Sequence, residues 1–161
     1  IFKITATVFV GTYASPLLAI VLFRATKIIS SVHLIQREDR IYPYITGAAC
    51  ALATAGFLRR AMAPEEIYLS IYSTAFVLVV STILIPYFKS SAHMAGATGF
   101  FALFLRLHQR YGVGGPEFLL LLLLMLSAVA WSRISLKRHT LQELLSGGLL
   151  GFSTVYALLS H

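Results

Sequence analysis

Two histidines, His93 and His139, lie at the starts of apolar segments and have cationic residues close by in the sequence. Arg133 lies six residues before His139, and Glu143 lies four residues after it. Cations can neutralise the oxygens of a phosphate group, and a positioned imidazole can attack phosphorus or transfer a proton. A carboxylate one helical turn beyond a histidine can hold one ring nitrogen and leave the other as the attacking atom. The pattern predicts a site that handles phosphate.

A zinc site is the competing interpretation of these histidines. The sequence contains no HExxH pattern, and its single cysteine, Cys50, excludes a paired-cysteine ligand set. The cations around the histidines would also oppose the binding of a divalent metal ion. We therefore expect neither a metal nor another cofactor at this site.

The composition indicates which elements must position these residues. Of the 161 residues, 58% are hydrophobic and only 12% are charged, whereas soluble domains carry about 25% charged residues. The charged residues gather in short clusters between apolar runs. Because a helix needs about 20 apolar residues to cross a bilayer, this segregation predicts membrane spans joined by short polar loops. The net charge of +7 fits cations that face anionic lipid headgroups, and no nucleic-acid partner is expected.

Six spans are predicted, at residues of about 4–24, 41–58, 67–88, 90–107, 116–132 and 141–160. No repeat, low-complexity tract or Gly/Ser linker divides the chain, so we expect a single domain over residues 1–161. The predicted fold class is all-α, an integral membrane six-helix transmembrane bundle. Any chemistry must then come from loop residues and helix ends at the membrane surface.

Three polar segments fall on the same face of such a bundle, because successive loops alternate between the two sides. These segments are Arg37 to Pro43, Lys89 to His93, and Ser132 to Glu143. Counting every cation places this face in the cytoplasm by the positive-inside rule. Four of its cations could bind phosphate instead: Arg37, Arg40, Lys89 and Arg133. Without them this face has four cations and the opposite face has five, so the charge distribution leaves the orientation open.

The third segment carries the most specific pattern. Ser132-Arg133, followed by His139 and then Glu143, has the spacing SRxxxxxHxxxD with Glu in place of Asp. This motif resembles that of the type 2 phosphatidic acid phosphatase family. The family's second motif, PSGH, is similar to Ser90-Ser91-Ala92-His93, in which Ser90 replaces Pro and Ala92 replaces Gly. Six transmembrane helices are also a feature of that family.

The resemblance implies a catalytic role for three matched residues. His139 would be the nucleophile that forms a phosphohistidine, Glu143 would orient it, and His93 would be the general acid for the leaving group. Thr140 and Glu143 also form a capping-box pattern, which would make Glu143 a helix-start residue. The two interpretations are compatible, since one carboxylate oxygen could accept the Thr140 N–H while the other orients His139.

Phosphate-binding residues are expected from all three segments. Arg133 and Ser91 are matched to the family's motifs, and Lys89 is added because of its proximity to them. The family's first motif, KxxxxxxRP, is replaced by a stretch in which Tyr42 stands where arginine is expected, with Arg37 and Arg40 as substitutes ahead of Pro43. The expected phosphate ligands are therefore Arg133, Ser91, Arg40, Arg37 and Lys89.

The sequence thus predicts an integral membrane lipid phosphatase. It would hydrolyse a phosphate ester or pyrophosphate headgroup through a phosphohistidine, without a metal ion. The alternatives are an undecaprenyl pyrophosphate phosphatase specifically, or a noncatalytic anionic-lipid binder or transporter. The resemblance implies a location in a bacterial inner (cytoplasmic) membrane with the site on the extracytoplasmic face. The expected partners are a lipid phosphate substrate and the bilayer, and the oligomeric state is open.

Overall fold

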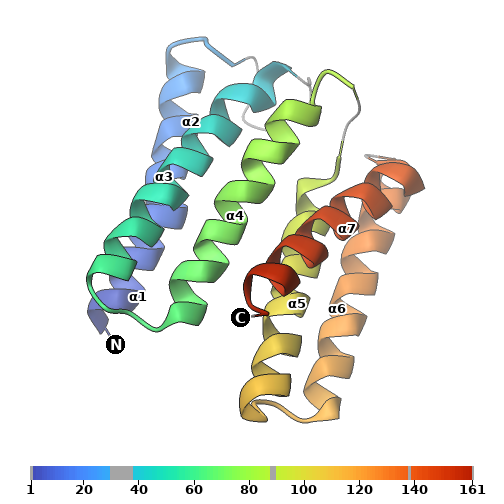
Figure 1. Ribbon diagram of the computed structural model, residues 1–161. Helices are drawn as coiled ribbons and strands as arrows, with labels where there is room; N and C mark the ends of the chain where they lie inside the picture. Colours follow the sequence, from blue (N-terminus) through green and yellow to red (C-terminus); the bar gives the residue numbers. More distant parts are fainter. Residues whose placement is uncertain (1, 30–37, 88–89, 138, 161) are drawn as a thin grey trace. The chain divides into compact units, whose positions relative to one another are not determined.

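The computed structural model describes residues 2–29, 38–87, 90–137 and 139–160. Every regular element within these ranges is helical, which confirms the predicted all-α class. The helices form two compact units, Ile1–Tyr87 and Phe88–His161, and each is described by itself (Figure 1).

The first unit begins with a continuous helical rod. α1 (Phe2–Phe9) passes through a π-helical turn (Val10–Ala14) into α2 (Ser15–Ala25). The wider turn precedes Pro16, which lies at the start of α2 and cannot donate a backbone hydrogen bond to the preceding turn. The rod therefore accommodates the proline without ending.

Two further long helices are described in the first unit. α3 (Ile41–Arg60) and α4 (Glu65–Leu84) are joined by a short turn at residues 61–64, and a single 3-10 turn (Glu38–Arg40) precedes α3. Small and branched apolar side chains form the buried core between them. This core comprises Ala51, Ala55, Leu58, Ala63, Ile71 and Ala75.

The second unit contains three helices, α5 (Ala92–Tyr111), α6 (Pro116–Ser135) and α7 (Leu141–Leu158). Gly112 and Gly114 take positive φ values of 65° and 73° in the turn after α5, a conformation that glycine adopts without a steric penalty. Pro116 then occupies the start of α6, where its missing N–H costs nothing. α6 returns beside α5, and α7 crosses α5 in Figure 1.

α5 and α7 are parallel, although they are not consecutive in the sequence. Hydrogen bonds join Ser91 to Glu143 near their starts, Thr98 to Gly148 further along, and Arg106 to Leu159 near their ends. α6 is antiparallel to both. One end of the unit, here called the motif end, is therefore the place where α5 and α7 begin and α6 finishes.

Glycine allows α5 and α7 to approach closely. A Cβ atom at Gly151 would overlap the backbone carbonyl of Ala95, and one at Gly147 would overlap that of Ser91. Thr98 also donates its hydroxyl to the carbonyl of Gly148 at 2.8 Å. Small residues four apart let helix backbones approach in this way, and polar side chains add hydrogen bonds across the contact.

Arg106 connects the C-terminal ends of α5 and α7. Its Nε and Nη2 atoms donate to the carbonyl of Leu159 at 3.2 and 3.0 Å, and its guanidinium lies over the Tyr156 ring. Gln109 Oε1 accepts from both Arg106 and Tyr156. A cation thus compensates the negative C-terminal end of α7.

The helix ends differ from the sequence-based boundaries for identifiable reasons. α4 ends at Leu84 rather than at residue 88, because Pro86 follows and has no backbone N–H to donate to the carbonyl four residues earlier. α5 extends to Tyr111 rather than 107, with His108 and Arg110 in its last turn. Basic residues stabilise a helix C-terminus, so a cluster of cations there does not mark a loop.

Within the described ranges, four helical segments are long and apolar enough to cross a membrane: Phe2–Ala25, Ile41–Arg60, Glu65–Leu84 and Pro116–Ser135. Six spans are predicted from the sequence, and four of them meet this criterion. α5 and α7 are helices of 20 and 18 residues whose ends carry polar and charged residues, among them Arg106 and Arg110 in α5 and Gln142 and Glu143 in α7, which lowers their mean hydropathy. That they also cross the bilayer stays a prediction.

Candidate active site

His139 and Glu143 form a hydrogen-bonded pair at the start of α7. His139 Nδ1 lies 2.9 Å from Glu143 Oε2, and the two side chains are only 6% and 21% exposed. A carboxylate can only accept hydrogen bonds, so the Nδ1 atom must carry the proton. In the neutral imidazole the lone pair then resides on Nε2, the nitrogen required for attack on phosphorus.

Thr140 holds the carboxylate of this pair in place through a capping box. Glu143 Oε2 accepts the backbone N–H of Thr140 at 3.1 Å, while Thr140 Oγ1 accepts the backbone N–H of Glu143 at 3.3 Å. The sequence-based expectation assigned the two bonds of the carboxylate to different oxygens. That detail is wrong, because Oε2 accepts from both His139 and Thr140. Capping and orientation are thus performed by one atom.

Ser91 connects the start of α5 to the same turn of α7. Its backbone N–H donates to the carbonyl of Glu143 at 3.0 Å, and its hydroxyl caps α5 by accepting from the Met94 N–H at 3.4 Å. Gly147 leaves the space for this contact. Ser91 has no exposed surface, so this arrangement favours a positioning role over direct contact with phosphate.

His93 is the second residue of α5 and follows Ser91 by two positions. Its side chain is exposed, whereas that of His139 is largely buried. The Ser91 to Glu143 bond places the helix turn that carries His93 next to the turn that carries Glu143. The two predicted catalytic histidines therefore both lie at the motif end.

Arg133 reaches the motif end from the last turn of α6. Its Nε atom is buried and has no hydrogen-bond partner among the described residues. A buried donor without a partner costs roughly 1–3 kcal/mol, more for a charged group. A phosphate oxygen is an acceptor that would satisfy it, and guanidinium groups bind phosphate with two parallel hydrogen bonds.

Helix dipoles add to the positive character of the motif end. α5 and α7 both begin there, each with backbone N–H groups in its first turn that have no partner within the helix. Anions bind favourably at such termini. The motif end thus combines two helix N-termini with Arg133 and two histidines, beside the Glu143 carboxylate and the C-terminal end of α6.

Three predicted phosphate ligands, Arg37, Lys89 and Arg40, stay predictions. Arg37 and Lys89 lie outside the described residues. Arg40 belongs to the first unit, where it interacts with the side chain of Tyr44. The described site therefore comprises His93, Ser91, Arg133, His139 and Glu143.

Sequence reasoning missed the residues that join the two motif segments. Gly147, Gly151 and Thr98 make the close contact between α5 and α7, and none of them was a candidate. The signal was the spacing of Gly147 and Gly151, four residues apart in an apolar segment, which is typical of closely packed helices.

No group of three or more His, Cys, Asp or Glu side chains that could hold a metal ion occurs within the described ranges. Comparison of the chain with family models, with curated proteins and with solved structures finds no match. The family resemblance accordingly rests on the motif residues, whose positions are those given above.

Proposed function

We propose that this protein is an integral membrane lipid phosphatase that works through a phosphohistidine on His139. The observation that carries the proposal is the contact between His139 Nδ1 and Glu143 Oε2 at 2.9 Å. It fixes the tautomer in which Nε2 can act as the nucleophile. The unpartnered Nε atom of Arg133 supports an anion as the group that is bound there.

A membrane environment is supported by the side chains that the helices leave uncovered within each unit. α6 has one buried residue, Leu122, while Leu120, Leu121 and Leu124 on the same helix are each more than half exposed. Apolar surface on this scale is unfavourable in water and matches contact with lipid tails. A site at helix ends can then meet a lipid headgroup at the membrane surface.

The proposed reaction has two steps. His139 Nε2 attacks the phosphorus atom, the bond from phosphorus to the bridging oxygen breaks, and protonated His93 gives its proton to the leaving group, which is an alcohol from a phosphomonoester and a lipid monophosphate from a pyrophosphate. Neutral His93 then takes a proton from a water molecule, whose oxygen attacks the phosphorus atom. The bond from phosphorus to His139 Nε2 breaks, and inorganic phosphate is released. Arg133 neutralises the oxygens of the transferred group in both steps.

The substrate is a lipid phosphomonoester or pyrophosphate. Both present a terminal phosphoryl group, and the residues of the motif end can neutralise either one.

We place the protein in a bacterial inner membrane with the motif end on the extracytoplasmic face. In a Cys50→Ala background, cysteines introduced at the exposed residues Met62 and Val113 should then resist an impermeant thiol reagent added from outside the cell. Labelling of both from outside would contradict this orientation.

The decisive experiment measures phosphate release by the purified full chain in detergent with EDTA present. The substrates are phosphatidic acid, phosphatidylglycerol phosphate and undecaprenyl pyrophosphate. His139→Ala should remove turnover, whereas His108→Ala should retain it. His108 lies at the other end of α5, where its Nδ1 contacts the carbonyl of Gly114 at 2.5 Å.

Trapping the intermediate provides a second readout. Phosphate transferred from labelled substrate should remain on wild-type protein after rapid denaturation in base and be lost in acid, as a phosphoramidate is. His139→Ala should carry none. No release from any substrate, together with intact binding, would favour the noncatalytic lipid binder or transporter.

A further inference from the structure

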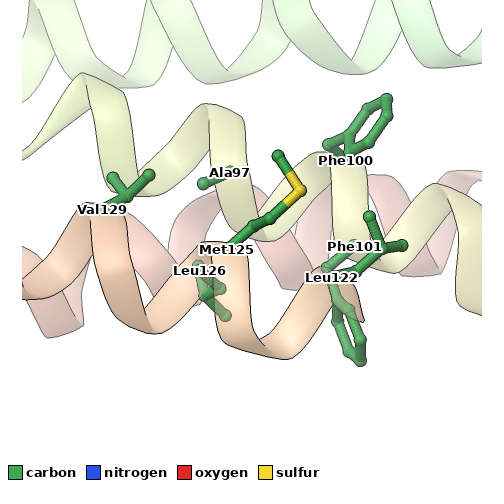
Figure 2. A pocket seen from close by; sticks show the side chains of 7 residues that line it. All are labelled: Ala97, Phe100, Phe101, Leu122, Met125, Leu126 and Val129. Atoms are coloured by element: carbon green, nitrogen blue, oxygen red, sulfur yellow. The ribbon is translucent and has the colours of Figure 1, made fainter. Parts of the chain in front are cut away.

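An apolar groove lies between α5 and α6. α5 contributes Ala97, Phe100 and Phe101, and α6 contributes Leu122, Met125, Leu126 and Val129. Its volume is about 170 Å³, and Figure 2 shows Met125 reaching from α6 toward α5 between Ala97 and Phe100. Apolar cavities of about 150 Å³ stay dry and take up a hydrocarbon as large as benzene. The groove therefore suits a short stretch of hydrocarbon chain.

The groove begins one helical turn from the motif end. Ala97 lies four residues after His93 on α5, and Val129 lies four residues before Arg133 on α6. Residues four apart share a helix face and are separated by about 5–6 Å. A molecule that contacts Arg133 or His93 with one end can therefore enter the groove with the next part of its length.

Aromatic rings limit how far the groove continues. Phe104 contacts Phe100 with ring centroids 4.8 Å apart and contacts Phe118 of α6 at 5.2 Å. The groove runs along α6 from Val129 to Leu122, which is a rise of about 10 Å. Phe118 lies one turn beyond Leu122, so the aromatic contact follows directly after the groove.

Met125 gives the groove an adaptable wall. Its side chain is 57% exposed, and that of Phe100 is 51% exposed, so both can change position without disturbing the helices. Methionine is flexible and polarisable, and it is common on surfaces that accept varied apolar ligands. An entering chain can therefore displace the Met125 side chain.

We propose that this groove binds the headgroup-proximal part of the hydrocarbon chain of the lipid whose phosphate is held at the motif end. The inference rests on the proposed phosphatase function for its substrate. The proposal adds that one lipid molecule occupies the groove and the motif end at the same time. Bulk lipid in the groove would have no need of a phosphate group, which gives a direct test.

Occupancy of the groove can be measured without turnover. Met125→Cys is combined with Cys50→Ala, and with His139→Ala so that the probe is not hydrolysed. Phosphatidic acid should slow labelling of this thiol by N-ethylmaleimide about tenfold. Diacylglycerol with the same chains, or glycerol 3-phosphate at the same concentration, should change the rate less than twofold. Leu124→Cys, a neighbour outside the groove, should label at one rate throughout.

Filling the groove should change chain recognition in the active protein. Ala97→Phe should raise the KM for phosphatidic acid about tenfold, as expected when about two methylene groups lose their contact. Hydrolysis of glycerol 3-phosphate should be unchanged. Leu124→Phe, which adds similar bulk outside the groove, should leave both substrates unaffected.

The possible results separate the two proposals. Equal protection by diacylglycerol and phosphatidic acid, or none by either, overturns the groove as part of the lipid site. An equal loss of activity toward both substrates in Ala97→Phe overturns it as well. Failure of the wild-type protein to hydrolyse any substrate defeats the phosphatase proposal, while selective protection of Met125→Cys would still assign the groove to an anionic lipid.

Discussion

The α3–α4 pair and the α5–α7 pair are both helix interfaces built on small residues, but the helices are antiparallel in the first pair and parallel in the second. α3 and α4 follow each other through a short turn and are antiparallel. α5 and α7 are separated by α6 and are parallel. The first interface is filled by alanine, leucine and isoleucine side chains. The second has backbone contacts at Gly147 and Gly151 and hydrogen bonds between the helices.

The direction of the helices determines which charges meet at each end. An antiparallel pair places the N-terminus of one helix beside the C-terminus of the other, so the partial charges compensate each other. A parallel pair gathers two positive ends on one side and two negative ends on the other. At the C-terminal ends of α5 and α7, the Arg106 guanidinium donates hydrogen bonds to the carbonyl of Leu159. The residues that resemble the phosphatase motifs lie at the N-terminal ends, where the partial charges are positive. The parallel pair is therefore the better support for an anion site.

If chemistry belongs to the parallel pair alone, then loss of its first-turn acid should have the largest effect. Glu143→Ala should lower kcat about 1,000-fold, because His139 loses both its charge partner and its tautomer control. Glu143→Gln should retain more activity, since one amide oxygen can still accept from both His139 and Thr140. Glu65→Ala, the corresponding first-turn change in α4, should retain wild-type turnover. An equal loss of turnover in Glu143→Ala and Glu65→Ala would contradict the assignment of the chemistry to the α5–α7 pair.

Glycine substitutions should separate the two interfaces next. Gly151→Ala places a Cβ against the Ala95 backbone and should lower the free energy of unfolding by about 1–3 kcal/mol. Gly56→Ala in α3 meets only the Tyr72 hydroxyl at 3.7 Å, an ordinary contact, so it should be neutral or stabilising by up to about 1 kcal/mol. Thermal unfolding in detergent measures both changes. A tolerated Gly151→Ala would mean that the close approach is not required.

Removal of the capping residue Thr140 should destabilise the protein less than Gly151→Ala does, and it should also lower turnover. Thr140→Ala removes the acceptor for the Glu143 N–H and should cost about 1 kcal/mol of stability. It should also lower kcat, because the Glu143 carboxylate becomes less firmly placed against His139. Thr140→Ser should restore both properties. Lost stability with unchanged kcat would show that the cap does not position the carboxylate.

The smallest expected effect concerns one hydrogen bond between α5 and α7. Thr98→Val removes the bond to the Gly148 carbonyl and should destabilise the protein by about 0.6 kcal/mol. Thr74→Val in α4 removes only a bond to Ser70 of the same helix and should have a smaller effect. A double mutant with Gly151→Ala should show coupling, since both residues act on one contact. Strict additivity would argue against that.

Several features were predictable because they depend on neighbours along the chain. Pro116 at a helix start, the cap at Thr140 and the pairing of His139 with Glu143 all follow from residues within four positions of each other. Helices and most of their lengths were likewise predicted from hydropathy alone. Such contacts are local, since the capping box at the start of α7 folds the Glu143 side chain back toward Thr140 and His139, which precede the helix, whatever the rest of the chain does.

What the sequence determined by itself was therefore a set of apolar helices with histidine, arginine and glutamate residues near their ends. The tertiary structure decided that α5 and α7 run side by side, that Ser91 bonds to Glu143, and that Arg133 Nε is buried without a partner. These features depend on which helix faces can approach each other, and that is set by missing Cβ atoms on one helix and backbone carbonyls on another. Because such partners lie some 50 positions apart in the chain, no local pattern specifies them.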